Sequence, residues 1–588
     1  MANSDTPVPP SKSRDSDTLG RLPGEPPAMP DGSMVTSPSL GIAGPSVAPP
    51  VDAPAPVAPN LSAEPIAGEE TVDVVIDGET VTVRKGTNVL EAAKLAGKDI
   101  CHFCYHQGLS IAASCRQCLV EIEKFPKLQP SCQVAVGEGM VVHTESPPVL
   151  KARREMLEFT LKNHPIDCPI CDKAGECTLQ RHYMDHDHAY TRVDVAKIRK
   201  PKHRDIGRDI ILDAERCILC SRCVRFCEEI PGTAELTMAW RGDREVIDIA
   251  EGHRLDNAYS VNVVDICPVG ALTSKDFRFQ IRAWELEATA TTCPGCATGC
   301  AVELHTKHER AYRLVPRHDP TVNGHWMCDE GRLVYKQLDP ERRVLHAVVD
   351  GESVSVVHAL QVAARRLENK ADTGSKVAVV FSAAATNEAN EALAALAELL
   401  EAERFVLGRP AGTGDDILLD ADKNPNTRGA HLAAGEVGKH EAELALELAG
   451  GAYEAVVFVD GVGELGDVAL AGLQSITSIC LADARTALSD ACTIVLPAAS
   501  WAEVLGTFVN RQGRLRAIAP AWRAEGERRH RADLLRDLVL ALGGRDIGSA
   551  RERTLALAQK HEHAELLKLL QEETALRPTL LRFGHTRG

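Results

Sequence analysis

The sequence lacks any long apolar run, and no stretch reaches the roughly eighteen unbroken apolar residues of a membrane-spanning helix. The first residues, MANSDTPVPPSKSRDSDT, contain no basic segment followed by an apolar one, so we expect no secretory signal. Excess positive charge is missing as well. The formal net charge of −17 argues against a nucleic-acid-binding surface. We also find no sequence repeat of fixed period.

Cysteine, by contrast, is abundant and unevenly distributed. Of 19 cysteines, all but Cys480 and Cys492 lie between Cys101 and Cys328. A secreted disulfide scaffold would need an export signal and a short chain, and disulfides do not persist in a reducing compartment. Clustered thiols in such a chain therefore predict bound metal.

The chain of 588 residues is long enough for several domains. Residues 1–66 hold fifteen of its 33 prolines and few large apolar residues, which predicts a disordered extension. Alternating apolar residues on either side of Asp77-Gly78 then predict a two-stranded hairpin. Asn88 can cap a helix that Gly97 ends, and a strand is predicted over Leu119–Ile122. This order of elements around a cysteine loop predicts a β-grasp ferredoxin.

The rest of the chain shows two further patterns of secondary structure. Residues 149–163 have the apolar spacing of an amphipathic helix, and residues 164–285 are predicted to be rich in loops. Short apolar runs then alternate with helical stretches such as 386–402 and 464–474, which predicts an α/β domain with a mostly parallel sheet. The predicted buried strands cover residues 376–382, 455–459, 478–483 and 493–497.

The first cysteine group consists of Cys104, Cys115, Cys118 and Cys132. Four thiolates, two of them in a C-x-x-C hook, suit two irons with two ligands each. Cys101 is left out, because pairing it with Cys104 would leave the other three cysteines one ligand short. A zinc site remains the alternative.

The second group consists of His164, Cys168, Cys171 and Cys177. Three thiolates leave one corner of a [4Fe–4S] cubane open, and the histidine four residues before the first cysteine can fill it. Because an imidazole ligand is neutral, we expect a higher reduction potential than four thiolates would give.

The third group includes Cys217, Cys220 and Cys223, whose C-x2-C-x2-C spacing wraps three corners of a [4Fe–4S] cubane. The fourth ligand is either Cys227 or the remote Cys267, which precedes a proline. In bacterial ferredoxins the remote Cys-Pro completes the cluster, so we predict that Cys267 is the ligand and that Cys227 is free.

The fourth group consists of Cys293, Cys296, Cys300 and Cys328, again four thiolates for one [4Fe–4S] cluster, with zinc as the alternative. Together the sites would hold one [2Fe–2S] and three [4Fe–4S] clusters. Several clusters on one chain make little sense for single-substrate chemistry. They predict instead a relay that passes one electron at a time.

Five motifs occur in the order "FCYH…CRQCLVE", "HPIDCPICDKAGECTLQ", "RCILCSRCVRFCEE", "DICPVGAL" and "TTCPGCATGC". In this order they closely resemble the iron–sulfur G subunit of bacterial NADH:quinone oxidoreductase, respiratory complex I. The resemblance covers about residues 70–520. It implies the four ligand sets given above, with the fourth cluster off the main electron route.

The resemblance also implies partners and a place in the cell. Electrons would arrive from a flavin-bearing, NADH-binding subunit and leave through another iron–sulfur subunit toward quinone. The chain itself would have no substrate site. We expect it on the cytoplasmic side of the plasma membrane, peripheral and in only indirect contact with the membrane arm.

The C-terminal part is similar to the molybdopterin-oxidoreductase fold, through residues 420–430 and 496–516. No cysteine lies between Cys328 and Asp420 to act as a molybdenum ligand, so we expect a shortened domain without molybdopterin. The predicted domains are an extension (1–66), a β-grasp [2Fe–2S] domain (67–148), three [4Fe–4S] domains (149–190, 191–285 and 286–342) and a molybdopterin-oxidoreductase-like α/β domain (343–588).

Three other functions compete with this interpretation. Gly461-x-Gly463-x-x-Gly466 follows a predicted strand, with Asp483 about twenty residues on, which is the dinucleotide fingerprint of an NADH-binding subunit. A glycine-rich turn is, however, common in any parallel α/β sheet, and we favour that interpretation. The second competitor is the iron–sulfur subunit of an NAD-linked hydrogenase or of a formate dehydrogenase, which shares the first three groups. A zinc scaffold without redox activity is the alternative from another class.

Overall fold

The computed structural model describes residues 64, 68–188, 190–372, 376–435, 441–460, 463, 465–571 and 579–580. All described residues belong to one compact unit of the chain. The extension predicted over residues 1–66 lies outside the described residues except for Glu64. No helix in the described part of the chain has the length and apolar character needed to cross a membrane.

The first domain is a five-stranded sheet with one helix. Its strand order is β2-β1-β5-β3-β4, and β1 pairs with β5 in parallel. Asp77 and Gly78 both have positive φ angles, of 48° and 87°, as a tight hairpin turn requires. The Asn88 side chain accepts a hydrogen bond from the Glu91 backbone N–H at 2.9 Å and caps the helix. The elements are β1 (Thr71–Ile76), β2 (Glu79–Arg84), α1 (Val89–Leu95), β3 (Leu119–Ile122), β4 (Gln129–Pro130) and β5 (Met140–His143).

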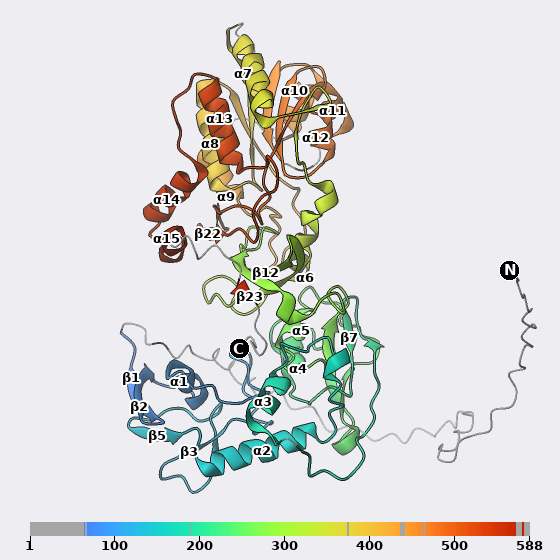
Figure 1. The fold of residues 1–588 in the computed structure, drawn as a ribbon, viewed down its shortest axis with the longest axis vertical. Coiled ribbons are helices and arrows are strands. Elements are labelled where there is room, and N and C mark those ends of the chain that lie inside the picture. Colours follow the sequence, from blue (N-terminus) through green and yellow to red (C-terminus); the bar gives the residue numbers. More distant parts are fainter. Residues whose placement is uncertain are drawn as a thin grey trace, which may run out of the picture. The chain divides into compact units, whose positions relative to one another are not determined.

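The middle of the chain consists of short elements joined by long loops, as the sequence predicts (Figure 1). Helix α2 (Pro147–Leu161) confirms the predicted amphipathic helix within two residues at each end. Small sheets then pair β7 with β10 and with β6, and β8 with β9. The elements after α2 are η1 (Cys168–Ile170), α3 (Thr178–His186), β6 (Arg204–Asp205), β7 (Ile210–Leu212), α4 (Arg222–Glu229), β8 (Leu236–Ala239), η2 (Gly242–Arg244), β9 (Val246–Ile249), α5 (Asn262–Ile266), β10 (Leu272–Ser274) and η3 (Ala283–Glu285).

An antiparallel sheet follows, in the order β13-β12-β11-β23, so that a strand near the C-terminus pairs with β11. The fourth cysteine group lies on the loops at the ends of these strands and at the start of α6. The elements are β11 (Glu287–Thr292), β12 (Ala301–Lys307), β13 (Arg310–Pro316), α6 (Asp329–Arg332), η4 (Val334–Leu338), η5 (Pro340–Arg342) and β23 (Thr579–Leu580).

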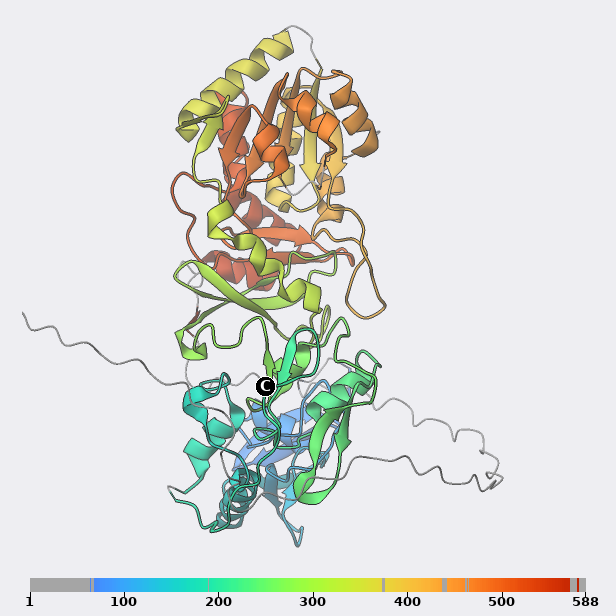
Figure 2. The same ribbon diagram turned by 90° about the vertical axis from the view of Figure 1, so that its right-hand side faces the viewer.

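The C-terminal region contains a seven-stranded sheet in the order β15-β14-β20-β19-β18-β16-β17. Its last five strands are parallel, and β14 joins β20 antiparallel. Figure 2 shows the yellow to orange strands side by side. The elements are β14 (Ala347–Val349), β15 (Glu352–Val354), α7 (Val356–Asp372), β16 (Val377–Ser382), α8 (Asn387–Leu399), β17 (Glu403–Leu407), α9 (Thr427–Ala434), α10 (Glu441–Ala449), β18 (Ala455–Val459), α11 (Asp467–Leu473), β19 (Thr477–Ala482), α12 (Ala487–Ala491), β20 (Ile494–Pro497), β21 (Gly506–Val509), β22 (Leu515–Ile518), α13 (Arg531–Ala541), α14 (Ala550–Lys560) and α15 (Ala564–Gln571).

Alternate residues of the central strands pack into two separate cores. Val379 and Val457 face α7, α8 and α13, whereas Val380 and Phe458 face α10, α11 and α12. These two sets of helices lie on opposite faces of the sheet (Figure 1). Strands buried on both faces must be apolar throughout, which explains why the sequence shows them as continuous apolar runs. The four predicted strands are confirmed within two residues at each end.

A buried carboxyl group joins three of the C-terminal elements. Glu388 of α8 is fully buried. Its carboxylate accepts hydrogen bonds from the backbone N–H of Thr507 at 3.0 Å and from the Thr507 hydroxyl at 2.8 Å. The hydroxyl of Thr554 in α14 donates a third bond at 3.1 Å. Burial nevertheless raises the pKa of Glu388 to about 7, because it penalises the charged form more than these bonds favour it.

Because of this raised pKa, we expect the free energy of unfolding to fall as pH rises. The folded-state pKa of about 7 lies above the ordinary value of 4.5, so the folded chain binds more protons between these values. The Glu388 contribution is complete below about pH 4.5 and is lost as pH rises through about 7, a change on the order of 3 kcal/mol. Glu388→Gln, which stays neutral, should therefore melt at the wild-type temperature at pH 5 and at a higher temperature at pH 8. Thermal unfolding of the full chain tests this.

The matched control is Glu398→Gln, an exposed position on the same helix. It should follow the wild type at both pH values. A Glu388→Gln protein that melts at or below the wild-type temperature at pH 8 would contradict the expected titration.

Candidate metal centres

The four cysteines of the first group form two pairs. The Sγ atoms of Cys118 and Cys132 lie 3.4 Å apart, and the thiol of Cys104 is hydrogen-bonded to that of Cys115. The hydrogen bond from Cys115 lowers the pKa of Cys104, and the one from Cys132 lowers the pKa of Cys118. Two thiol pairs, each with one thiol that ionises readily, match the donor set that two irons with two ligands each require.

The second group lies in the loop between α2 and α3. Cys168 begins η1, and Cys177 is the N-cap of α3, where its Sγ accepts the backbone N–H of Gln180 at 3.5 Å. The Cys168 thiol acts electrostatically on Cys171, and Cys171 acts on Cys177. The three thiols are therefore close enough for the charge of one to affect the pKa of the next.

His164 has the properties of a neutral ligand. Burial lowers its pKa to about 4, so the imidazole is uncharged at neutral pH. Its Nδ1 atom is buried and has no hydrogen-bond partner in the described part of the chain. The charges that act most on the ring are those of Asp167, Lys197 and Arg216, of which Asp167 precedes Cys168 and Arg216 precedes Cys217.

The third group surrounds a cavity that distinguishes the two candidate fourth ligands. Cys217, Cys220, Cys223 and Cys267 all line it, whereas Cys227 does not. Cys227 is fully buried and its thiol is hydrogen-bonded to the Glu235 side chain. The geometry therefore brings together the four residues that the ferredoxin pattern selects.

The fourth group also surrounds a cavity, lined by Cys293, Cys296, Cys300 and Cys328. Cys328 is the N-cap of α6, and its Sγ accepts the backbone N–H of Gly331 at 3.3 Å. A Cβ atom at position 331 would lie 3.2 Å from the Cys293 Sγ and 3.3 Å from the Cys328 Sγ. Glycine at this position therefore keeps space open beside both sulfur atoms.

Burial keeps most of these thiols protonated when no metal is bound. It raises the pKa of Cys217 to about 12 and that of Cys220 to about 11. The same cause raises the pKa of Cys177 and of Cys328 to about 12. Thiols with such values are poor nucleophiles at neutral pH, so the arrangement suits metal coordination, in which the metal displaces the proton, better than covalent catalysis.

Direct contacts join the second group to the third. Arg216 and Asp167 form a two-pronged ion pair, with Nε–Oδ1 and Nη2–Oδ2 distances of 2.9 and 2.6 Å. The backbone N–H of Thr178, next to Cys177, donates to the Pro268 carbonyl at 3.0 Å. A Cβ atom at Gly270 would lie only 2.3 Å from the Cys171 Sγ, so this close approach requires glycine.

Two arginines of α4 join the third group to the first. The guanidinium of Arg222 donates to the Ile266 carbonyl at 3.1 Å and also to the Tyr105 carbonyl. Arg225 donates to the carbonyl of Cys104 itself. Both arginines are buried, and each thus holds the backbone beside a predicted ligand of another group.

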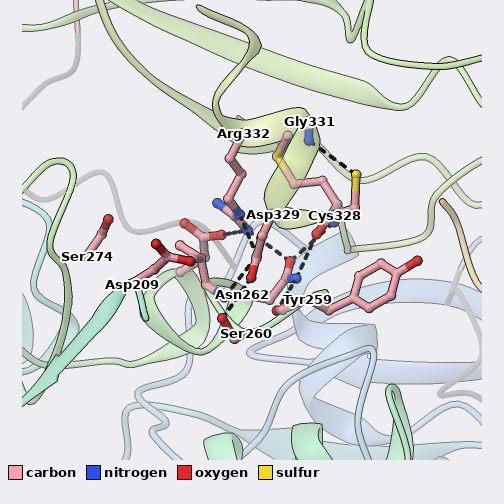
Figure 3. A network of polar contacts seen from close by, with 12 residues as sticks. Asp209, Tyr259, Ser260, Asn262, Ser274, Cys328, Asp329, Gly331 and Arg332 are labelled. Atoms are coloured by element: carbon pink, nitrogen blue, oxygen red, sulfur yellow. Dashed lines mark hydrogen bonds and ion pairs between the residues drawn. The ribbon is translucent and has the colours of Figure 1, made fainter. Parts of the chain in front are cut away.

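A short polar network joins the third group to the fourth (Figure 3). The Asn262 side chain donates to the Met327 carbonyl at 2.8 Å and accepts the Met327 backbone N–H at 3.2 Å. The Asp329 carboxylate accepts the Ser260 hydroxyl at 2.7 Å and the Val261 backbone N–H at 3.0 Å. Helix α5, which leads into Cys267, is in this way fixed to the residues on either side of Cys328.

Sequence reasoning missed these linking residues. Arg222 and Arg225 lie inside one of the cysteine motifs, so their proximity to a site was visible, but the partners through which they link the groups are more than forty residues away.

The structure adds little support for the dinucleotide-binding alternative. Gly461 lies outside the described residues, and the Asp483 carboxylate lies 3.4 Å from the Arg531 guanidinium.

Comparison with known protein families identifies four iron–sulfur regions. Residues 69–147 match the 2Fe-2S iron-sulfur cluster binding domain, and residues 153–192 match the NADH-ubiquinone oxidoreductase-G iron-sulfur binding region. Residues 207–273 match the ferredoxin-like domain of NADH-quinone oxidoreductase subunit 3. Residues 286–340 match the molybdopterin oxidoreductase Fe4S4 domain.

Several curated proteins are similar to this sequence. The G subunit of NADH-quinone oxidoreductase from Rickettsia bellii is 42% identical over 271 residues, 46% of this chain and 40% of that protein. Its namesake in Streptomyces coelicolor is 38% identical over 306 residues, 51% of this chain and 36% of that protein. A mitochondrial protein of Solanum tuberosum named NADH dehydrogenase [ubiquinone] iron-sulfur protein 1 is 42% identical over 274 residues, 47% of this chain and 37% of that protein.

A solved structure with a similar chain is titled crystal structure of NAD+-reducing [NiFe]-hydrogenase in the H2-reduced state. That chain is 32% identical and covers 36% of this chain and 91% of its own length, but the TM-score of 0.33 is too low to support an argument. The present chain spans about 40% of the length of the curated relatives it matches. Its cysteine-rich part is similar in sequence to the G subunit of NADH-quinone oxidoreductase and carries both 2Fe-2S and 4Fe-4S binding domains.

Proposed function

We propose that this chain is an electron-transfer subunit of an NADH:quinone oxidoreductase. Electrons would pass from a flavin-bearing, NADH-binding partner toward a downstream iron–sulfur subunit and quinone. The observation that carries the proposal is the contact between neighbouring cysteine groups: second with third, third with first, and third with fourth. Bound iron–sulfur clusters supply one-electron transfer. A substrate site on this chain is not part of the proposal.

The proposed ligands follow from the donor chemistry of each group. Two thiol pairs suit a [2Fe–2S] cluster, three thiols with a neutral imidazole suit one [4Fe–4S] cluster, and four thiols around a cavity suit each of the other two. The proposed sets are Cys104, Cys115, Cys118 and Cys132; His164, Cys168, Cys171 and Cys177; Cys217, Cys220, Cys223 and Cys267; and Cys293, Cys296, Cys300 and Cys328.

The chain's own residues would do three things for these clusters. Buried thiols and the apolar side chains around them keep water away from the metal sites. Arg222 places a positive charge near the thiols of Cys220 and Cys104, and the ionised thiols in turn favour its charged form. The contacts through α4 and α5 hold the sites at fixed separations, on which electron transfer depends.

The finer domain assignment belongs to the same proposal. The parallel pairing of β1 with β5 beside α1 supports a β-grasp [2Fe–2S] domain over residues 67–148. We propose [4Fe–4S] domains over 149–190, 191–285 and 286–342, and a shortened molybdopterin-oxidoreductase-like domain over 343–588. By analogy with the relatives' names, we place the chain with other subunits of the complex, peripheral on the cytoplasmic side of the membrane.

The proposed function is tested by anaerobic purification of the tagged chain from its own cells. We expect about fourteen irons per chain with an equal amount of acid-labile sulfide. Flavin-bearing and iron–sulfur subunits should co-purify, and mass spectrometry should identify them. Co-purification with nickel-containing or molybdenum-containing subunits, or a chain that holds zinc in place of iron, would refute the proposed function.

The third ligand set makes a paired prediction. Cys267→Ala removes a thiol that lines the cavity, so the neighbouring [4Fe–4S] EPR signal should disappear and about four irons should be lost. Cys227→Ala removes a thiol outside the cavity and should retain both the signal and the iron. Because each variant loses one buried cysteine, in α4 or at the end of α5, each is a control for the other. The reverse outcome would assign Cys227 as the ligand.

The second ligand set predicts a shift in reduction potential. His164→Cys replaces a neutral imidazole with an anionic thiolate, so the midpoint potential of the second cluster should fall, by on the order of 100 mV. An EPR-monitored redox titration measures this shift, with the other three clusters as internal references. An unchanged potential with an intact signal would show that position 164 does not coordinate the cluster.

A further inference from the structure

Cys101 belongs to none of the four groups, yet it lies beside two histidines from a distant part of the chain. It is three residues before Cys104, and only 1% of it is exposed. His182 and His186 are one turn apart on α3, so their side chains share a face of that helix. One potential ligand atom from each of the three residues lies within 4.8 Å of the other two.

The closest contact is between the Cys101 Sγ and the His182 Nδ1, at 3.2 Å. The rings of His182 and His186 are 6.2 Å apart with an interplanar angle of 36°. His182 is 2% exposed and His186 is half-buried. The cluster is therefore closed on the Cys101 side and open toward solvent beside His186.

The two inner side chains are uncharged. Burial raises the pKa of Cys101 to about 12 and lowers the pKa of His182 to about 2, so neither the thiol nor the imidazole carries a charge at neutral pH. The His182 Nε2 atom is buried, and the ring's other hydrogen-bonding neighbour is the backbone of His102.

Charges of both signs surround the cluster. Asp99 and Asp185 act on Cys101 as negative charges, whereas Arg153 and Arg181 act as positive ones. Arg181 is already paired with Asp99, and Arg153 donates to the Thr144 carbonyl at 2.9 Å. His102, which is close enough to act electrostatically on His182, has its pKa lowered to about 4 by burial and is neutral. The surroundings therefore carry no large excess of positive charge that would repel a metal ion.

We propose that Cys101, His182 and His186 bind one Zn²⁺ ion. One sulfur and two imidazole nitrogens are a normal zinc donor set, and a water on the side of His186 would complete four ligands. Binding replaces the thiol proton of Cys101, so one proton is released for each zinc bound. A single thiol is too few for an iron–sulfur cluster, which is why the ligand count set Cys101 aside.

The ion would connect two segments that carry different metal centres. Cys101 leads into the first cysteine group, and α3 starts at Cys177, the last cysteine of the second. A zinc ion would thus fasten the loop before Cys104 to the helix after Cys177. Because this site uses none of the sixteen proposed cluster ligands, it does not depend on the proposed function.

The test is zinc analysis and zinc K-edge X-ray absorption on the full chain, purified anaerobically and given one equivalent of Zn²⁺. We expect one zinc per chain after dialysis, with iron unchanged. Its coordination shell should contain one sulfur at about 2.3 Å and two histidine nitrogens at about 2.0–2.1 Å. An all-sulfur shell would mean that zinc occupies a cluster site, and would overturn the proposal.

Variants locate the ion. Cys101→Ser, His182→Ala and His186→Ala should each reduce bound zinc to background while the EPR signals of the clusters persist. The matched control is His188→Ala, an exposed histidine just beyond the same helix, which should retain the zinc. A zinc-free wild type, or zinc that persists in all three variants, would overturn the site. The coordination shell of the wild type decides the question even if a variant fails to fold.

Discussion

The buried guanidinium of Arg222 holds the first cysteine group against the third. It reaches the backbone before Cys267 and the backbone after Cys104, and its Nε atom is buried without a partner in the described part of the chain. A buried cation is costly, and burial indeed lowers the pKa of Arg222. Thiolates and a negatively charged cluster would offset that cost. Cluster binding and the docking of α4 should therefore stabilise each other.

Arginines are placed in a similar way near the second and the fourth cysteine groups. Arg216 is 3% exposed, pairs with Asp167 and lies close enough to Cys171 to be influenced by its thiol. The half-buried Arg409 donates to the Pro294 carbonyl at 2.8 Å and is influenced by Cys293 and Cys296. In each case the arginine lies beside thiols of one group and binds a residue next to a proposed ligand. Each arginine thus offsets the negative charge of nearby thiolates and also holds the loop beside them.

How much of the fold and of the cysteine groups could be predicted from the sequence depended on how far apart the interacting residues lie along the chain. Strands β16 and β18 appear as apolar runs because both faces are buried, and the Asp77-Gly78 turn follows from local backbone preference. The cysteine groups were found because most ligands of one site lie within about fifteen residues. The strand order, in which β18 lies between β19 and β16, depends on crossovers that no local pattern records.

The candidate site shows the same limit. Cys267 was selected over Cys227 by the Cys-Pro pattern of bacterial ferredoxins, which does not require contact information. Cys101 was set aside by counting ligands, and its neighbour His182 is 81 residues away in sequence. His182 and His186, four residues apart, would have been a usable signal if a helix had been predicted there, but residues 164–285 were predicted to be rich in loops. Without the fold, however, nothing pointed from them to Cys101.

Two stretches of the C-terminal region contact the loop of the fourth group. The Ala297 backbone N–H donates to the Asp422 carbonyl at 2.9 Å, and the Arg511 backbone N–H donates to the Ala297 carbonyl at 2.7 Å. Ala297 lies between Cys296 and Cys300, whereas Asp422 and Arg511 are more than one hundred residues further along the chain. The C-terminal region therefore holds the loop of the fourth group in place, through backbone contacts made to the cysteine loop itself.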